Sequence, residues 1–331
     1  MSNPERQGTT ADDSPFEVRS DIEITETERW MQWADRTLLA PLRIAADDWR
    51  TVLGSAIIGS YILMGTLGVL LVEPTEQNDG EDLVGPFQTA EFPLGTNGVG
   101  EDIFAKIVHA TPEVLLMSLT GATVAVLLAI VVGVTAGYVG GTTDRVLSTL
   151  IDSQIAIPGL PLVILLAIFL EPSNPFVIGI ILSIDGWPGL ARSLRSEVLS
   201  VKKTNYVEAA RIMGDTRPRI MLTDVLPNLL PFIGINFMNT ARNIIFAAVG
   251  LYFIGALPYS LQNWGIMLNK AYNSTALFVP EAFHWLFFPM LAIILYSAGL
   301  VLIAQGTDRL FNPRIRARHA ETVEESPDET A

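Results

Sequence analysis

The sequence predicts an all-α membrane protein with six transmembrane helices. The 331-residue chain is 50% hydrophobic, and its charged residues leave long stretches with no charge at all. Each stretch is close to or above the length of about 20 residues that a helix needs to cross the hydrocarbon core. None alternates apolar and polar residues as a membrane strand does, and spanning segments must pair their backbone groups internally. Helices are therefore the expected spanning elements.

Four of the six predicted spans carry no charge, and two carry a single one. The stretch 243–269 contains Gly255 and Pro258, so its second half is predicted to be a loop rather than a seventh span. Gly133 and Gly137 predict close packing of the second helix. The charge-free spans are 51–72, 114–143, 153–170 and 285–307, while 172–191 contains Asp185 and 225–255 contains Arg242.

The distribution of Lys and Arg predicts that both termini are cytoplasmic. This orientation leaves 18 of the 21 Lys and Arg residues inside, in agreement with the positive-inside rule. The chain then divides into five parts. These are an acidic N-terminal tail with an amphipathic segment at the lipid surface (1–47), the first transmembrane helix (48–73), an extracytoplasmic loop (74–111), a five-helix core with a cytoplasmic loop at 193–223 (112–308), and a C-terminal tail (309–331).

Composition excludes several classes of function. Cysteine is absent, and His109, His284 and His319 are too scattered to form a metal cluster, so we expect no metal site. No phosphate-binding Gly-x-x-x-x-Gly-Lys-Ser/Thr loop is present, so we expect no cofactor, no catalytic residue and no ATP hydrolysis by this chain. The long polar segment before the first span predicts an anchor rather than a cleavable signal.

The net charge of −14 argues against nucleic acid as a partner. The chain has four Lys and 17 Arg, and its tails are acidic. Acidic, Lys-poor surfaces are tolerated in concentrated salt, where screening removes self-repulsion, so we interpret the source as a halophilic prokaryote. Acidic tails without special purpose are the alternative interpretation.

The loop 193–223 contains the most informative motif. Glu208, Ala209, Ala210 and Arg211 lie in a predicted short helix that Gly214 ends by adopting a left-handed conformation. We expect the small alanines on its exposed face to let another backbone approach closely. Leu226 and Pro227 follow at a fixed distance.

This pattern resembles the cytoplasmic loop of permeases in ATP-binding cassette importers. In the family an aliphatic residue is preferred at the position of Asp224, whereas here it is Val225. The segment 92–103 is similar to the one before the second helix in the dipeptide, oligopeptide and nickel branch, although Asn97 and Glu101 replace the usual Asp and Arg. The resemblance runs from about residue 92 to 317.

The resemblance implies the type I importer (MetI-like) permease fold and a place in the plasma membrane. It implies three protein partners: ATPase subunits that dock on the Glu208 loop, a second homologous permease subunit, and an extracytoplasmic substrate-binding protein. The expected cargo is di- or oligopeptides. Nickel complexes or sugars remain alternatives, as do a secondary transporter without an ATPase and a membrane scaffold.

Ionisable residues within or beside the predicted spans are candidates for function, because each costs about 3 kcal/mol or more at mid-membrane without a partner. They are Asp152, Asp185 and Arg242, with Asn239 one turn before Arg242. We expect local pairing for the two carboxylates. Arg242 meets either a carboxylate or the water-filled pathway, and we favour the carboxylate.

Overall fold

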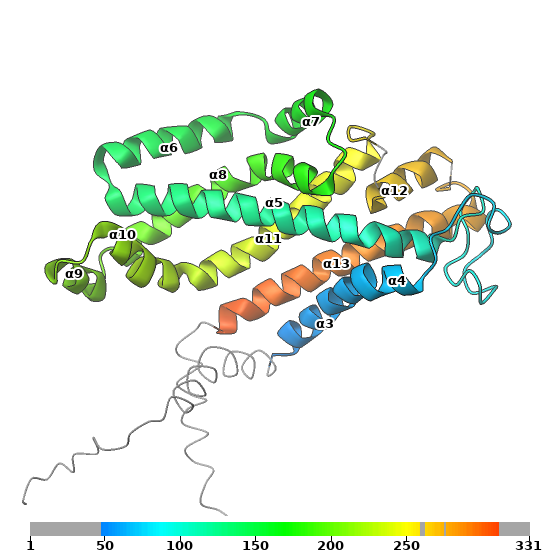
Figure 1. The fold of residues 1–331 in the computed structure, drawn as a ribbon, viewed down its shortest axis with the longest axis horizontal. Coiled ribbons are helices and arrows are strands. Elements are labelled where there is room, and N and C mark those ends of the chain that lie inside the picture. The colour runs from blue at the N-terminus through cyan, green and yellow to red at the C-terminus, as the bar shows by residue number, and fades with distance from the viewer. Residues whose placement is uncertain (1–47, 259–261, 275, 311–331) are drawn as a thin grey trace, which may run out of the picture. The chain divides into compact units, whose positions relative to one another are not determined.

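The computed structural model describes residues 48–258, 262–274 and 276–310, and the amphipathic segment and both tails lie outside this part of the chain. The described residues form helices joined by loops, with one isolated bridge between Thr96 and Asp102 (Figure 1). Five helical segments are long and apolar enough to cross a membrane, and a bent helix pair makes a sixth. The predicted all-α membrane architecture is confirmed.

The first span consists of α3 (Trp49–Leu63), a π-turn η2 (Met64–Gly68) and α4 (Val69–Leu71). It begins at Asp48, whose carboxylate accepts the Arg50 N–H at 3.0 Å. Figure 1 shows it beside the last helix, α13 (Phe283–Leu310). The Tyr61 hydroxyl donates to the Ala292 carbonyl at 2.7 Å, which ties the two ends of the described chain together.

The second span, α5 (Ile103–Val139), begins earlier than expected. Its first residues fall within the segment 74–111 that we expected to be a loop. Asp102 caps the helix, because its carboxylate accepts the N–H groups of Phe104 and Ala105. The hydropathy pattern missed this start because charged residues occupy the first three turns, so the helix extends beyond its uncharged part.

The predicted third span is divided into two helices. The helices α6 (Gly141–Ala156) and α7 (Gly159–Leu170) meet at an angle of 81°. Pro158 has no N–H and disfavours helical geometry at Ile157. The predicted span 153–170 is therefore broken at Pro158, and α6 lies against α5 and α8 (Pro175–Val201).

The second half of the chain contains the remaining elements. The loop after α8 holds α9 (Asn205–Ile212), and the fifth span is built from α10 (Arg217–Ile220), a π-turn η3 (Met221–Val225) and α11 (Leu226–Phe253). The predicted loop before the last span contains α12 (Trp264–Asn273), which at 10 residues is too short to span, followed by η4 (Pro280–Ala282).

Two apolar clusters hold the helices together. One lies around Trp264, Tyr252 and Tyr61, where α3, α5, α11, α12 and α13 meet. The other lies around Leu194 and Tyr138 and includes residues of α5, α6, α8, α9 and α11. The second cluster matters most for function, because it joins the short α9 to three of the spanning helices.

Candidate functional site

The helix α9 is fixed at both ends by local hydrogen bonds. Before its first turn, the Thr204 hydroxyl donates to the Val201 carbonyl at 2.6 Å. After its last turn, Gly214 has φ = 87°, and the Asp215 N–H donates back to the Ala210 carbonyl at 3.2 Å. This is the left-handed helix end that the sequence predicts, and glycine adopts it without a Cβ penalty.

One face of α9 is buried and the other is free. Val207 and Ala210 are 0% and 4% exposed and belong to the second apolar cluster. Ile212 and Met213 are 81% and 78% exposed. The expectation that the alanines lie on the exposed face is thus corrected for Ala210, and the exposed residues of the motif are Glu208, Ala209, Arg211 and Gly214.

The aliphatic residue that the family prefers at position 224 is found one position later in this chain, at Val225. Val225 is fully buried in the second cluster, while Asp224 is only partly buried and accepts the Thr223 hydroxyl at 3.0 Å. Both lie in the π-turn η3, whose hydrogen bonds close over one more residue than those of an α-helix. The extra residue rotates the chain so that Val225 points inward where Asp224 otherwise would.

Leu226 and Pro227 lie at the start of α11, directly after the turn η3 that contacts α9. Leu226 packs against the second cluster, and Pro227 is exposed in the first turn of α11, where its missing N–H is not needed. The helix α9, the turn η3 and the first turn of α11 therefore form one connected unit that carries the motif residues, which we call the α9 unit.

Ion pairs fasten α6 to α8 beside this unit. The Arg195 guanidinium binds both carboxylate oxygens of Asp144, at 2.5 and 2.8 Å. Arg192 also pairs across the two helices, through a single contact with one carboxylate oxygen of Asp152. The Lys202 ammonium donates to the Tyr138 carbonyl at 2.5 Å, which ties the end of α8 to α5. Sequence reasoning missed the pair of Asp144 and Arg195, because no local pattern relates residues 51 positions apart.

The other intramembrane candidates are Asp185, Asn239 and Arg242, and they form no ion pair with one another among the described residues. The carboxylate of Asp185 lies against Gly159 at the α6–α7 break and makes no hydrogen bond or ion pair within the described residues. Arg242 donates to the Asn243 side chain at 3.2 Å, its Nε is buried without a partner, and the described part of the chain places no carboxylate beside it. Asn239 is half-buried one turn earlier in α11.

Comparison with known proteins gives consistent matches. The family model described as "Binding-protein-dependent transport system inner membrane component" matches residues 129–317. The chain is 28% identical over 86% of its length to a dipeptide transport system permease protein, DppC, of Bacillus subtilis, covering 90% of that protein. It is 30% identical over 67% of its length to the oligopeptide transport system permease protein OppC of the same organism, covering 72% of it.

Two further matches extend the comparison. A glutathione transport system permease protein, GsiD, of Pectobacterium atrosepticum is 29% identical over 86% of this chain and 99% of its own length. Among solved structures, an inward-facing MetNI methionine ABC transporter has a TM-score of 0.49 at 20% identity, covering 64% of this chain and 95% of that one.

Proposed function

The chain belongs to the family of binding-protein-dependent transport system inner membrane components, and from this we propose that it imports di- or oligopeptides with energy from a separate ATPase that docks on α9. It is a multi-pass plasma membrane protein and the permease subunit of an ATP-binding cassette importer. Permeases of this family are not enzymes, and the proposal therefore assigns ATP hydrolysis to a partner.

The observation that carries the docking proposal is the two-faced character of α9. Val207 and Ala210 are buried in the core, whereas Ile212 and Met213 expose most of their apolar surface at the end of the helix. Exposed apolar side chains beside charged ones are typical of a contact surface for another protein. Glu208 and Arg211 lie on this free face and supply charges of opposite sign for the contact.

The connections of α9 suggest how docking moves the pathway. The helix follows α8 after a short turn and contacts η3 at the start of the fifth span. Through Val207 it packs in the same cluster as α5, α8 and α11. A force on the exposed face is therefore transmitted to three spanning helices as a unit, and ATPase closure can shift them between inward-open and outward-open arrangements.

Two further partners belong to the proposal. A chain with five or six spans supplies half of a pathway, so we infer a second homologous permease subunit beside it. The segment between α4 and α5 lies at the opposite end of α5 from α9, where an extracytoplasmic binding protein would deliver substrate. This orientation, with both termini in the cytoplasm, rests on the distribution of Lys and Arg.

Peptide is the substrate class that the similar permeases favour, because their names specify dipeptide, oligopeptide and glutathione transport. Nickel complexes or sugars are the alternatives within the same class of importer. A secondary transporter or scaffold is disfavoured by the family membership.

Substitution on the free face of α9 tests the docking proposal. Ala209→Arg adds a long charged side chain to this face without disturbing the core, since Ala209 is exposed. We expect the variant to insert normally but to lose most ATPase co-purification and transport. Thr216→Arg is the matched control, because Thr216 is exposed in the neighbouring loop and its side chain makes no cap hydrogen bond. Wild-type co-purification with Ala209→Arg would refute docking on α9.

A further inference from the structure

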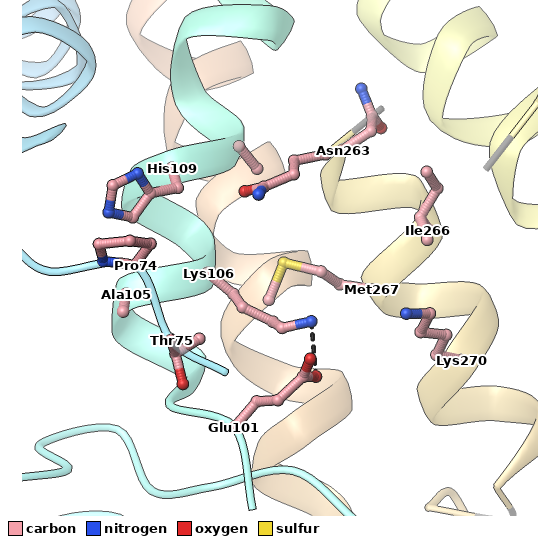
Figure 2. A pocket seen from close by; sticks show the side chains of 12 residues that line it. Pro74, Thr75, Glu101, Ala105, Lys106, His109, Asn263, Ile266, Met267 and Lys270 are labelled. Atoms are coloured by element: carbon pink, nitrogen blue, oxygen red, sulfur yellow. Dashed lines mark ion pairs between the residues drawn. The ribbon is translucent and has the colours of Figure 1, made fainter. Parts of the chain in front are cut away.

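Cavities of opposite chemistry lie near the two ends of α5. The pocket at its first turns is polar and is lined by Lys106 and Lys270, and Figure 2 shows Lys106 paired with Glu101, at 2.5 Å. The cavity at its last turns is an apolar groove of about 540 Å³, which we call the α5 groove. The charge of Lys106 is balanced inside the chain, whereas the single charge at the α5 groove is not.

Two walls form the α5 groove. The last part of α5, from Ile130 to Val139, is one wall, and α10, η3 and the first residue of α11, from Arg217 to Leu226, are the other. Apart from Arg217 and Thr135, the described side chains that line it are apolar. The groove is open at its rims, because Val131 on one wall and Leu222 on the other are 64% and 65% exposed.

The α5 groove lies in one half of the membrane. Its walls belong to the candidate spans Ile103–Val139 and Arg217–Phe253, and it reaches the last residue of the first span and the first residue of the second. From Ile130 to Val139 the helix rises about 14 Å, at about 1.5 Å per residue. This rise is close to half of the hydrocarbon core, which is about 30 Å thick. The groove therefore extends through about one leaflet.

Arg217 supplies the charge at the surface end of the groove. Its side chain is exposed and makes no ion pair within the described part of the chain. The neighbouring Arg219 differs, because it pairs with Asp215 at 3.4 Å. No carboxylate lines the groove among the described residues, so the positive charge of Arg217 is free at the level where lipid headgroups begin.

The occupant of the groove must be apolar along its length and anionic at one end. The apolar walls alone do not select an occupant, because lipid chains are as apolar as leucine side chains. Arg217 does select, since a guanidinium binds phosphate oxygens in a bidentate manner. A helix of a second permease would fill the apolar part, but it would leave this charge unbalanced unless it also placed a carboxylate there.

We propose that the α5 groove binds one anionic phospholipid, with an acyl chain between α5 and the α10–η3 segment and the phosphate on the guanidinium of Arg217. The order of apolar walls and terminal charge is the order of chain and headgroup in such a lipid. Because Arg217 lies in the segment that joins α9 to α11, the bound lipid contacts the element next to the α9 unit.

Photocrosslinking in vesicles tests this site. The full chain, with the subunits that co-purify with it, is reconstituted in phosphatidylcholine that contains a trace of phosphatidylglycerol or phosphatidylcholine with a photoreactive acyl chain. Mass spectrometry locates the crosslinked peptides. We expect crosslinks in segments 130–139 and 217–226, with a yield about fivefold higher for phosphatidylglycerol, which is the preference that one basic side chain at the membrane surface confers.

Charge variants test the role of Arg217. Arg217→Gln should lower the phosphatidylglycerol yield in the groove by about fivefold, to the level of phosphatidylcholine. Arg217→Lys, which keeps the charge, should retain most of the yield. Arg145→Gln on α6 is the matched control, because it also removes an exposed arginine that has no ion pair among the described residues but does not line the groove. We expect no change in this variant.

Tryptophan variants test whether the chain lies inside the groove. Val131→Trp fills the groove from its rim and should abolish crosslinks there with both probes, whereas Leu127→Trp, one turn earlier and exposed outside the groove, should not. Absence of crosslinks in both walls would show that another protein segment covers the groove and would overturn the proposal. Equal yields of the two probes, with no effect of Arg217→Gln, would reduce the site to general bilayer contact and overturn it as well.

Discussion

At the residue scale, two glycines of α5 determine how closely α5 and α8 can approach each other. A Cβ on Gly133 would lie 2.5 Å from the Ala191 carbonyl oxygen, and one on Gly137 would lie 2.8 Å from the Arg195 carbonyl oxygen. Real Cβ atoms do not approach this closely, so the two helices can touch backbone to backbone only because both positions are glycine. The predicted close packing of the second helix is confirmed.

Gly133→Ala should destabilise the protein, because the added methyl group forces α5 away from α8. Overpacking of this kind costs about 1–3 kcal/mol. Gly189→Ala in α8 is the matched control, since a Cβ there meets no atom within 4 Å and alanine favours the helix. Thermal unfolding in detergent should show a lower midpoint for Gly133→Ala alone; equal midpoints would contradict the close contact.

Arg242 has a buried hydrogen-bond donor that no residue of the described chain satisfies. Its buried Nε has no partner among the described residues, and an unpaired cation inside a membrane is costly. A carboxylate from a second subunit, or water in the pathway, must therefore compensate it. If the partner is a carboxylate of a second subunit, Arg242 has the ion-pairing role that the sequence analysis favours, with its partner on another chain.

If a carboxylate of the proposed second subunit pairs with Arg242, Arg242→Gln should lower the yield of the assembled transporter, because it leaves that buried carboxylate without its partner. Arg242→Lys, which keeps the charge, should recover part of the yield. Co-purification of the second permease measures the effect. Normal assembly with reduced substrate-stimulated ATP hydrolysis would instead place Arg242 in the pathway, and full transport in Arg242→Gln would exclude both roles.

At the element scale, α6 is held against α8 by two ion pairs and one buried apolar residue. Its contacts with α8 include the two ion pairs of Asp144 and Asp152, and Ile151 is its fully buried apolar residue. The break at Pro158 separates α6 from the apolar α7, and both helices pack against α8. The ion pairs thus fix the position of α6 beside the α9 unit.

A double-mutant cycle on Asp144 and Arg195 measures this fastening. The two side chains are 22% and 31% exposed, so solvent screens the pair and we expect a coupling of about 1 kcal/mol. Arg195→Ala should lower the unfolding midpoint slightly and Asp144→Ala equally, with little added effect in the double variant. The charge exchange Asp144→Arg with Arg195→Asp should recover part of the loss, and strict additivity of the single changes would show that the pair is not coupled.

At the scale of the whole molecule, the surface along the spans is apolar. Leu127 and Val131 on α5 and Ile168 and Phe169 on α7 are among the large apolar side chains that remain more than half exposed. Soluble monomers rarely expose apolar surface of this extent. These side chains can contact lipid, in agreement with membership of a membrane transport family, or the second permease that we propose.

The proposed orientation is tested with single cysteines in this cysteine-free chain. Asp82→Cys, between α4 and α5, should react with an impermeant thiol reagent on intact cells, whereas Lys203→Cys, after α8, should react only after permeabilisation. Both side chains are exposed in the structure, so a difference in labelling reports the side of the membrane and not burial in the protein. Labelling of position 203 but not 82 on intact cells would reverse the orientation.

The sequence by itself determined the features that depend on local chemistry. Uncharged length indicated the spanning segments, and Gly214 indicated the left-handed end of α9, because both depend on neighbouring residues alone. The Glu208 motif and the family resemblance were also found from the sequence, since each motif that carries the resemblance is a short local segment.

Only the tertiary structure decided which side chains meet. The burial of Ala210, the inward position of Val225, the pairing of Asp144 with Arg195, and the convergence of Lys106 and Lys270 all depend on which helices lie side by side. The start of α5 and the helix α6 were missed because hydropathy detects lipid-facing length and not helices stabilised by caps and ion pairs. Contacts between segments that are distant in the sequence depend on packing, and a hydropathy pattern carries no information about them.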